Sequence, residues 1–484
     1  MSPRDLLNDP CWQGADLGHP LPDHRHAVSV ALPRWRDVIA YEEQEASCRD
    51  ALRTVYPRFG QHPWVSELCQ RVARPGFTAW PFPTEAAACA AEQHCQRQAP
   101  GSTTRRMAVS DLTVLQCDPA ASPHAKAFWQ HTGLGASSRQ AAVVLGHEPA
   151  PKPEAAAEAK SQLRARLAAI HGCDPALISL HPSGMSGLHA ALRAIDVLTP
   201  GRPTLQLGFP YVDVLKQPQV VFHGGELLQT TDLSVVSATL DQLKPAAVIV
   251  ELPSNPLLRC VNLPAIADLA HQRGIPLIAD DTIGTAINLA VLPYVDLLFT
   301  SLTKSFAGSG DVMAGSLLIS PSSPWNQALL KALQPLAALS DADAIALNEA
   351  SRDVQHRVHQ LDAHCLTLAQ RLENHPAIKT VMHPKDCSNF RALMRPGAGF
   401  GCLLSFELQD GRSRAQQVYD NLRISKGPSL GTCFSLACPY TLLAHYDELA
   451  WAADCGVPAH LLRVSVGLED PDELWQRFVD ALDA

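Results

Sequence analysis

In the second third of the chain, short apolar runs alternate with helical patterns. AAVIVEL (246–252), PLIAD (276–280) and VDLLFTS (295–301) each hold consecutive apolar residues, a pattern typical of strands that are buried on both faces. Between the first two, LPAIADLAHQRG has an apolar face at helical spacing, with Asn262 as a plausible N-cap. Strand, helix and strand in this order predict a parallel sheet covered by helices.

A helix preceded by small polar residues is predicted earlier in the chain. AKSQLRARLAAIHG indicates a helix that ends at Gly172. In HPSGMSGLHAALRAIDVL, the next predicted helix begins near Ser183 and Gly184. Backbone N–H groups and the positive end of the dipole make such a helix start a phosphate-binding position. A plain N-cap explains the same residues.

The last third of the chain predicts a second, smaller unit. Apolar residues at steps of three and four predict one long helix across 341–374. The strand patterns IKTVMH, GCLLSFEL and LLRVSVGL follow, with two helical patterns among them. We therefore divide the chain into an N-terminal extension (1–150), a large domain (151–340) and a C-terminal small α/β domain (341–484).

Composition narrows the range of partners and compartments. The 484 residues carry a net charge of −9 and no basic block, which argues against nucleic acid as the partner. No run of about 18 apolar residues occurs, so no membrane span is expected. The N-terminus lacks the apolar core of a signal peptide. Fourteen cysteines without a Cys-x-x-Cys pair favour a reduced pool of thiols and a cytoplasmic location.

The segment TSLTKSFAGSGDVMAGS (300–316) carries the strongest candidate chemistry. It places Lys304 at the carboxyl end of a predicted buried strand, where sites of such sheets lie. Partial desolvation disfavours the ammonium form, and such lysines form Schiff bases with carbonyl compounds, including pyridoxal phosphate (PLP). The neighbouring hydroxyls of Ser301 and Thr303 could bind a phosphate. A surface lysine in a βα loop is the alternative interpretation.

Further polar residues fall at or just after predicted strand ends: Glu251, Ser254, Asn255 and Asp280. A buried carboxylate such as that of Asp280 would keep a pyridine nitrogen protonated and make the ring an electron sink. By itself, an aspartate at a strand end is also typical of a helix cap or a loop hydrogen bond. In chain order, the phosphate-type turn, the aromatic Tyr211, Asp280 and Ser-x-Thr-Lys together favour the cofactor site.

These motifs resemble the transsulfuration (Cys/Met metabolism) family of PLP-dependent enzymes. The matching pieces run in the family's order: SGMSG (183–187), ELPSNPLLR (251–259), ADDT (279–282), SLTKSFAGSGDVMAG (301–315), KGPSLG (426–431) and LLRVSVGLED (461–470). HAVSVALPRWRDVIAYEE (26–43) and AKAFWQHTGLGASSR (125–139) also resemble the extended, fungal-type cystathionine γ-synthases. The resemblance covers most of the chain.

The resemblance implies an aspartate aminotransferase-like α/β fold (fold type I), with a mostly parallel seven-stranded sheet in the large domain. It implies that Lys304 holds PLP and moves protons, that Asp280 contacts the pyridine nitrogen, and that Tyr211 stacks on the ring and assists proton transfer. The other implied cofactor-binding residues are Gly184, Met185, Ser301, Thr303 and Asn255. Arg463 and Ser429 would bind the substrate carboxylate, and no metal is implied.

The sequence departs from the family pattern in three places. We interpret the family's Tyr-x-Arg segment, which reaches the phosphate of the neighbouring subunit, as absent and replaced by Arg139. Asp281 stands where an asparagine is usual. The stretch Gly-Gly-x-Glu-Ser becomes GTCFS (431–435), so the acid that would meet a second amino acid is missing.

The resemblance implies γ-replacement on an O-acylhomoserine by cysteine to give cystathionine, in a homodimer or homotetramer in which residues 125–139 complete a neighbour's site. An O-acylhomoserine sulfhydrylase, a γ-synthase with another nucleophile, a cystathionine β- or γ-lyase and a non-catalytic scaffold are alternatives. The acyl group, the incoming nucleophile and the role of residues 1–120 stay open.

Two other classes fit the sequence poorly. The glycine cluster GAGFG (397–401) precedes a predicted strand rather than opening a helix, so the dinucleotide-binding context fails. His359, His364 and Cys365 do not share one helical face, which argues against a zinc site.

Overall fold

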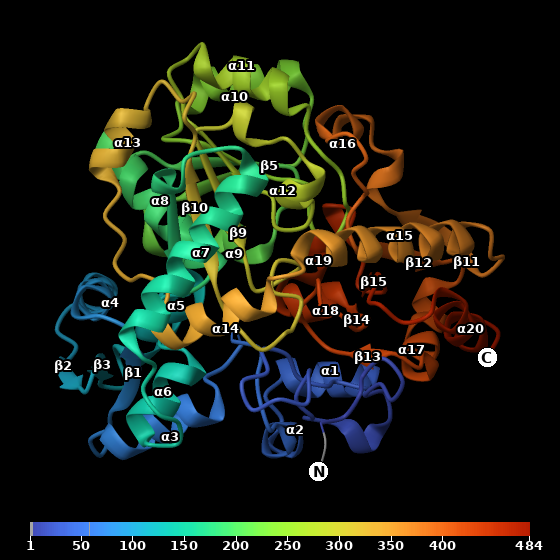
Figure 1. Ribbon diagram of the computed structural model, residues 1–484, viewed down its shortest axis with the longest axis horizontal. Coiled ribbons are helices and arrows are strands. Elements are labelled where there is room, and N and C mark those ends of the chain that lie inside the picture. The colour runs from blue at the N-terminus through green and yellow to red at the C-terminus, as the bar shows by residue number, and fades with distance from the viewer. Residues whose placement is uncertain (1–2, 58) are drawn as a thin grey trace.

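The computed structural model describes residues 3–57 and 59–484, and its largest sheet has seven strands (Figure 1). In spatial order these are β4 (Ile178–His181), β10 (Gly315–Ile319), β9 (Leu297–Ser301), β8 (Leu277–Asp280), β7 (Val248–Glu251), β5 (Thr204–Leu207) and β6 (Gly225–Leu228). The strands from β9 to β6 run parallel, and β10 runs antiparallel to both β9 and β4. The predicted mostly parallel, seven-stranded sheet is confirmed.

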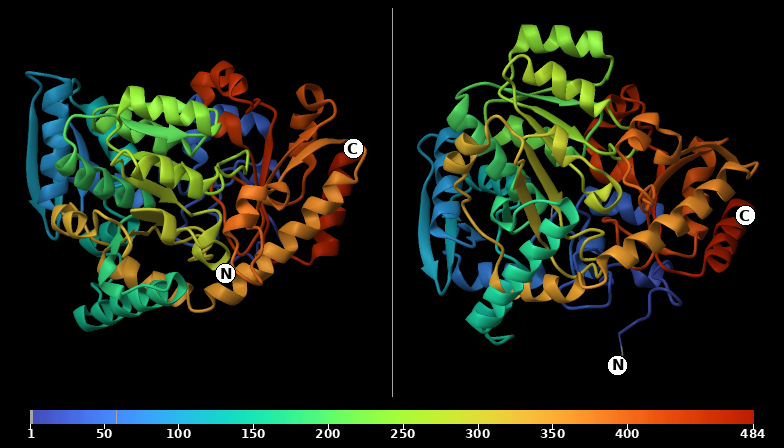
Figure 2. Two further views of the ribbon diagram at one scale, coloured as in Figure 1. Left: turned by 90° about the horizontal axis from the view of Figure 1, so that it is seen from above. Right: turned by 45° about the horizontal axis from the view of Figure 1, so that its top comes forward.

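Helices cover both faces of this sheet (Figures 1 and 2). One face packs against α8 (Gly184–Leu198), α9 (Val212–Val221) and α13 (Asn326–Ala332). The other packs against α7 (Pro153–His171), α10 (Leu233–Leu243), α11 (Leu263–His271) and α14 (Asp341–Ala350). Because successive side chains of a strand alternate, Ile278 of β8 joins the first core and Leu277 and Ala279 join the second.

The predicted helix ends are explained by local capping. Helix α7 ends at Gly172, which has a φ of 70°, a conformation that glycine adopts without strain. The Asn262 side chain accepts a hydrogen bond from the Ala265 N–H at the start of α11. Ser183 caps α8 by accepting a hydrogen bond from the Ser186 N–H at 3.1 Å.

The small domain is built on a five-stranded sheet and α15 (Val354–Glu373). Its strands are β11 (Ile378–Met382), β12 (Leu403–Leu408), β15 (Leu462–Ser465), β14 (Leu436–Pro439) and β13 (Ser425–Lys426). Its other helices are α16 (Ser388–Leu393), α17 (Gly411–Asn421), α18 (Tyr440–Ala444), α19 (Leu449–Asp454) and α20 (Pro471–Leu482). Neighbouring strands pair antiparallel except β13 and β14.

The prediction of one continuous helix across 341–374 was wrong, because α14 ends at Ala350 and α15 begins at Val354. The two helices pack against different hydrophobic cores. Helix α14 packs on α7 in the large domain, whereas α15 packs mainly in the small domain. The Arg357 guanidinium donates to the carbonyls of Phe306 and Ala307, which fixes the start of α15 against the loop after Lys304.

The N-terminal residues pack in two places (Figures 1 and 2). Helices α1 (Trp35–Glu42) and α2 (Ala46–Ala51) lie beneath the small domain and add Val38 and Cys48 to its core. On the opposite side lies an antiparallel sheet in the order β1-β3-β2. That side comprises α3 (Pro63–Val72), β1 (Thr78–Phe82), α4 (Glu85–Gln98), β2 (Thr104–Val109), β3 (Leu112–Cys117), α5 (Ser122–Thr132) and α6 (Ser138–Leu145).

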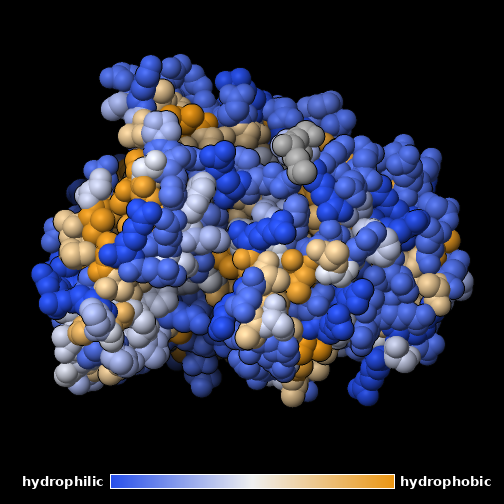
Figure 3. All heavy atoms as spheres, turned by 90° about the horizontal axis from the view of Figure 1, so that it is seen from below, coloured by the Kyte–Doolittle hydropathy of each residue, from blue (hydrophilic) through white to orange (hydrophobic). Residues whose placement is uncertain are grey.

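On the face shown in Figure 3, hydrophobic residues gather in separate patches between hydrophilic ones. Within residues 3–57 and 59–484, no helix combines the length and the apolarity that crossing a bilayer requires.

Candidate active site

A cavity of about 200 Å³ lies where the parallel strands β7, β8 and β9 end. Its lining contains every site residue that the sequence singled out: Arg139, Gly184, Met185, Tyr211, Asn255, Asp280, Ser301, Thr303, Lys304, Ser429 and Arg463. The structure thus brings together residues from both domains, and their individual roles stay predictions.

Lys304 follows β9 and is almost completely buried. Its Nζ donates to Ser429 Oγ at 2.9 Å and to Tyr56 Oη at 3.0 Å. The same nitrogen lies 5.0 Å from the centroid of the Tyr56 ring, within the range of a cation–π contact. The amine is therefore held in place by one residue from the small domain and one from the N-terminal extension.

Tyr56 is the residue that the sequence interpretation missed. The sequence reads Tyr-Pro-Arg at 56–58, so the inferred absence of a Tyr-x-Arg segment was wrong; Arg58 itself lies outside the described residues. The triplet was the signal that could have found this residue. It stands far from the other matching motifs, and only folding brings it to Lys304.

We expect Tyr56→Phe to lower kcat by about 10- to 100-fold, since a hydrogen bond to a charged group contributes about 1.5–3 kcal/mol. The ring and its contact with the amine stay in place. Steady-state kinetics and a pH–rate profile of the variant measure the effect. Tyr446→Phe, which removes a surface hydroxyl bonded to Glu43, is the control. Equal kinetics in the two variants would show that the Tyr56 hydroxyl makes no contribution to catalysis.

Asp280 ends β8, the strand beside β9, and is fully buried. Its Oδ1 accepts a hydrogen bond from the Thr282 N–H at 2.9 Å. Burial raises the pKa of Asp280 to about 6, because the charged form loses hydration. A cation placed against this carboxylate would favour its charged form. A protonated pyridine nitrogen is such a cation.

The first turn of α8 forms another wall of the cavity. A Cβ on Gly184 would lie 2.9 Å from Ser301 Cα, so glycine allows the helix to approach β9 closely. The turn directs the positive end of the helix into the cavity. Thr303 Oγ1 donates to Ala314 O at 3.3 Å and accepts from Ala314 N at 3.0 Å, so its predicted role as a phosphate donor requires the hydroxyl to rotate.

Arg463 lies at the far side of the cavity and is 6% exposed. Its Nη1 donates to Asn255 Oδ1 at 3.2 Å, and its Nη2 donates to Ser429 O at 2.9 Å. The guanidinium also packs over the Tyr440 ring at 4.9 Å. A planar guanidinium held on two sides matches a carboxylate well.

Glu251 organises the loops between these residues. Its Oε2 accepts hydrogen bonds from the backbone N–H groups of Tyr211 and Asn255, both at 2.9 Å. Burial raises the pKa of Glu251 well above its usual value. One carboxyl group at the end of β7 therefore positions both Tyr211 and Asn255, the partner of Arg463.

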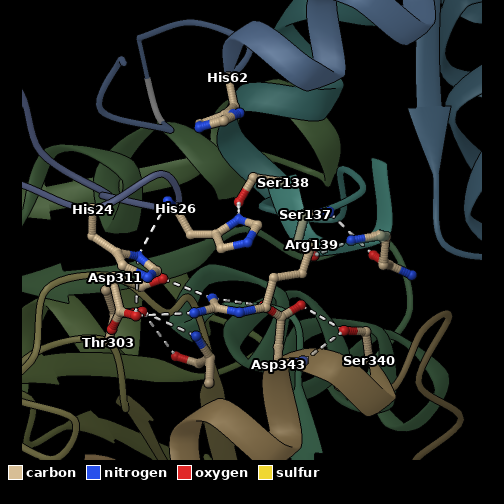
Figure 4. Close-up of polar contacts among 12 residues, drawn as sticks. His24, His26, His62, Ser137, Ser138, Arg139, Thr303, Asp311, Ser340 and Asp343 are labelled. Atoms are coloured by element: carbon tan, nitrogen blue, oxygen red, sulfur yellow. Dashed lines mark hydrogen bonds and ion pairs between the residues drawn. The ribbon is translucent and has the colours of Figure 1, made fainter. Parts of the chain in front are cut away.

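Arg139 is engaged within its own chain (Figure 4). Its guanidinium donates to Asp311 O at 2.7 Å and to Asp311 Oδ2 at 3.0 Å, and it lies 3.4 Å from Asp343 Oδ1. His24 contacts the same Asp311 carboxylate at 3.4 Å. Arg139 therefore joins the loop after Lys304 to α14 and the N-terminal arm. Its predicted role as a cofactor ligand requires it to exchange one of these partners.

Two histidines of the N-terminal extension line the same side of the cavity (Figure 4). His26 bonds to Ser138 Oγ at 2.9 Å and to Glu148 Oε1 at 3.0 Å. Burial lowers the pKa of His26 to about 3 and that of His62 to about 4. Both are therefore neutral near pH 7 and form an uncharged wall.

Asp281, which stands where the family has asparagine, lines a small second cavity beside α7, whereas Asp280 lines the main cavity. Its Oδ1 accepts a hydrogen bond from Thr300 Oγ1 at 2.5 Å. Burial raises the pKa of Asp281 to about 7. Below about pH 7 most molecules therefore carry a protonated Asp281, which resembles an asparagine in charge.

We expect Asp281→Asn to flatten the dependence of stability on pH. The folded-state pKa of about 7 lies above the ordinary 3.8, so the folded protein holds the proton more tightly. That stabilisation is complete below about pH 4 and is lost as the pH rises through 7. It amounts to about 1.4 kcal/mol per unit of pKa difference. Melting curves of both proteins from pH 4 to 8 measure it, and parallel curves would contradict it.

The geometry defines a class of protein. A nearly buried lysine after a parallel strand, a buried aspartate on the adjacent strand and a helix start at one cavity characterise the fold type I PLP-dependent enzymes. Residues 156–483 match the family model described as "Cys/Met metabolism PLP-dependent enzyme". The chain belongs to this family, and the predicted family and cofactor are confirmed. Residues 64–137 match the model "Fungal trans-sulfuration enzyme, N-terminal domain".

Relatives over nearly the whole chain carry different names. An L-2-amino-4-chloropent-4-enoate dechlorinase/desaturase of Streptantibioticus cattleyicolor is 34% identical, over 96% of this chain and 97% of that protein. A cystathionine gamma-synthase of Neurospora crassa is 30% identical, over 96% and 98%. The fold matches a crystal structure of cystathionine gamma synthase from Xanthomonas oryzae with a TM-score of 0.60, 24% identity and coverage of 70% and 89%.

The residues present fit PLP. The Lys304 amine could hold its aldehyde, the Asp280 carboxylate its pyridine nitrogen, and the first turn of α8 with Ser301 its phosphate. When bound, PLP supplies an electron sink for negative charge on substrate carbon.

Proposed function

We propose that the protein is a PLP-dependent transferase acting at Cγ of an amino acid, and specifically a cystathionine γ-synthase that joins an O-acylhomoserine to cysteine. The observation that carries this proposal is the convergence of Lys304, Asp280 and Arg463 on one cavity. An amine, a buried acid and a guanidinium are the groups needed to move a proton, hold the cofactor and bind an α-carboxylate. The Neurospora crassa relative, which is named a cystathionine gamma-synthase, supports the same activity.

Each residue has a definite task in this proposal. Arg463 binds the α-carboxylate of the O-acylhomoserine and so directs its Cα–H towards the Lys304 amine. Lys304 removes that proton, a second proton leaves Cβ as the acyl group departs from Cγ as its carboxylate, and Lys304 returns protons to Cα and Cβ once the sulfur is bound. The sulfur of cysteine takes the place of the acyl group at Cγ. Ser429 and Tyr56 keep the amine aligned between these steps.

A panel of substrates tests the proposal. O-succinyl-, O-acetyl- and O-phosphohomoserine are each supplied with cysteine, with sulfide or with no nucleophile, and the products are identified by mass spectrometry. Cystathionine from at least one donor is the expected result. Homocysteine from sulfide alone would make the protein a sulfhydrylase. No turnover of any acyl donor would overturn the proposal.

A second candidate is elimination of the Cγ substituent without an incoming thiol. Two observations favour it: the relative at 34% identity is named a dechlorinase/desaturase, and GTCFS (431–435) lacks the acid that would meet a second amino acid. A γ-halogenated amino acid offered without a nucleophile tests it. Release of halide at a rate above that of the acyl donors would favour this candidate.

We propose further that the protein is a homodimer or homotetramer in the cytoplasm. Residues 125–139, which supply Arg139 and part of α5 to the edge of the site, would lie at a contact between subunits. Light scattering during size-exclusion chromatography measures the mass, and a fully active monomer would contradict this proposal.

A further inference from the structure

Cys260 and Cys387 lie side by side although 127 residues separate them. Cys260 lies in the loop between β7 and α11, and Cys387 is the residue immediately before α16. The Cys260 N–H points at Cys387 Sγ, with 3.4 Å between the two atoms. The Cys260 thiol also hydrogen-bonds to that sulfur. Asn389 Nδ2 donates to Cys260 O at 2.9 Å and keeps the two segments together.

The surroundings of the Cys387 sulfur stabilise negative charge. This sulfur accepts hydrogen bonds from the Cys260 thiol and from the backbone N–H groups of Cys260, Asn389 and Phe390. These hydrogen bonds, the thiol contact first, lower the pKa of Cys387, whereas the pKa of Cys260 is raised by the same contact and by burial. Cys387 is partly exposed, and Cys260 is buried beneath it. The thiolate is the reactive form of cysteine, so one sulfur is available for attack and the other lies behind it.

Cys95, Cys117 and Cys455 each lack at least one of these two properties. Cys95 and Cys117 also share a thiol–thiol hydrogen bond, but both are completely buried. Cys455 is partly exposed, but burial raises its pKa. Cys387 is both partly exposed to solvent and surrounded by groups that stabilise its thiolate.

We propose that Cys387 is an exchange site for small disulfides of the glutathione type and that Cys260 completes the exchange. The Cys387 thiolate attacks one sulfur of the disulfide, forms a mixed disulfide and expels the first thiolate. Cys260 loses its proton to solvent and attacks Cys387 Sγ, which expels the second thiolate. The pair is oxidised to a protein disulfide, and the small disulfide is reduced to two thiols.

The new bond would act on the active-site loop. Within that loop Ser254 N donates to Arg259 O at 2.9 Å and Leu258 N donates to Ser254 O at 2.8 Å, so backbone hydrogen bonds close the loop between Asn255 and Cys260. Asn255 in turn holds Arg463. The bond would therefore tie the loop that supports Arg463 to the start of α16.

The test exposes the full-length protein to oxidised glutathione, blocks the remaining thiols and maps peptides by mass spectrometry. We expect a cross-linked pair of peptides containing Cys260 and Cys387, lighter by two hydrogens. Cys260→Ser should stop the exchange halfway and leave glutathione on Cys387. Cys387→Ser should leave Cys260 unmodified.

Other cysteines of the same protein serve as controls. Cys95, Cys117 and Cys455 should stay reduced under conditions that oxidise Cys387 completely. If Cys387 reacts no faster than Cys455, or if Cys260→Ser carries no glutathione at Cys387, the proposal is overturned. The readout is a covalent mass and is independent of the reaction that the enzyme catalyses.

Discussion

Replacing Lys304 by alanine should abolish covalent cofactor binding and lower kcat by at least about 1,000-fold. The substitution removes the amine that would both hold PLP and move the substrate proton. A positioned acid–base group alone contributes about 10²–10⁴-fold. The variant should lose the mass gain on residue 304 after borohydride reduction with PLP. Activity, the visible absorption of bound cofactor and peptide mass are measured together.

Two controls make the Lys304 experiment specific. Lys331→Ala removes an exposed lysine from α13 and should behave as the wild type. Circular dichroism of Lys304→Ala should show an intact fold, because truncating this amine deletes contacts to Ser429 and Tyr56 without opening a core. Full activity of the alanine variant would rule out the central role of this amine.

Asp280→Asn should lower kcat by about 10²–10⁴-fold. Breaking a buried ion pair costs about 3–5 kcal/mol, and each 1.36 kcal/mol in the barrier is tenfold in rate. Asparagine keeps the shape of Asp280 and its contact with Thr282 but removes the charge that would keep the pyridine nitrogen protonated. Kinetics and the absorption spectrum of the PLP-loaded variant measure the effect.

The adjacent residue supplies a matched control. Asp281→Asn makes the same chemical change one position later, on a side chain directed at Thr300 rather than into the main cavity. It should retain activity close to that of the wild type. Similar losses of activity in both variants would mean that a structural change at the end of β8, and not the loss of a negative charge beside the cofactor, lowers the rate.

The secondary structure around the site was largely predictable because its signals are local. Consecutive apolar residues mark β7, β8 and β9, and the caps Ser183 and Asn262 lie within three residues of the groups they bond. Since sites of parallel sheets lie beyond the carboxyl ends of strands, the strand pattern made Lys304 and Asp280 candidates, and the family resemblance implied their roles. The break between α14 and α15 was not predictable in this way, because each of these helices packs against a different hydrophobic core.

By itself, the sequence determined the class of fold and the cofactor, and it indicated Lys304 and Asp280 as candidates to bind that cofactor, because each depends on short motifs of residues near one another in the chain. The tertiary structure decided which distant groups meet them: Tyr56 at Lys304 across 248 residues, Asp311 and Asp343 at Arg139, and Cys387 at Cys260. Such contacts arise from the packing of whole domains, which fixes positions that no local pattern encodes.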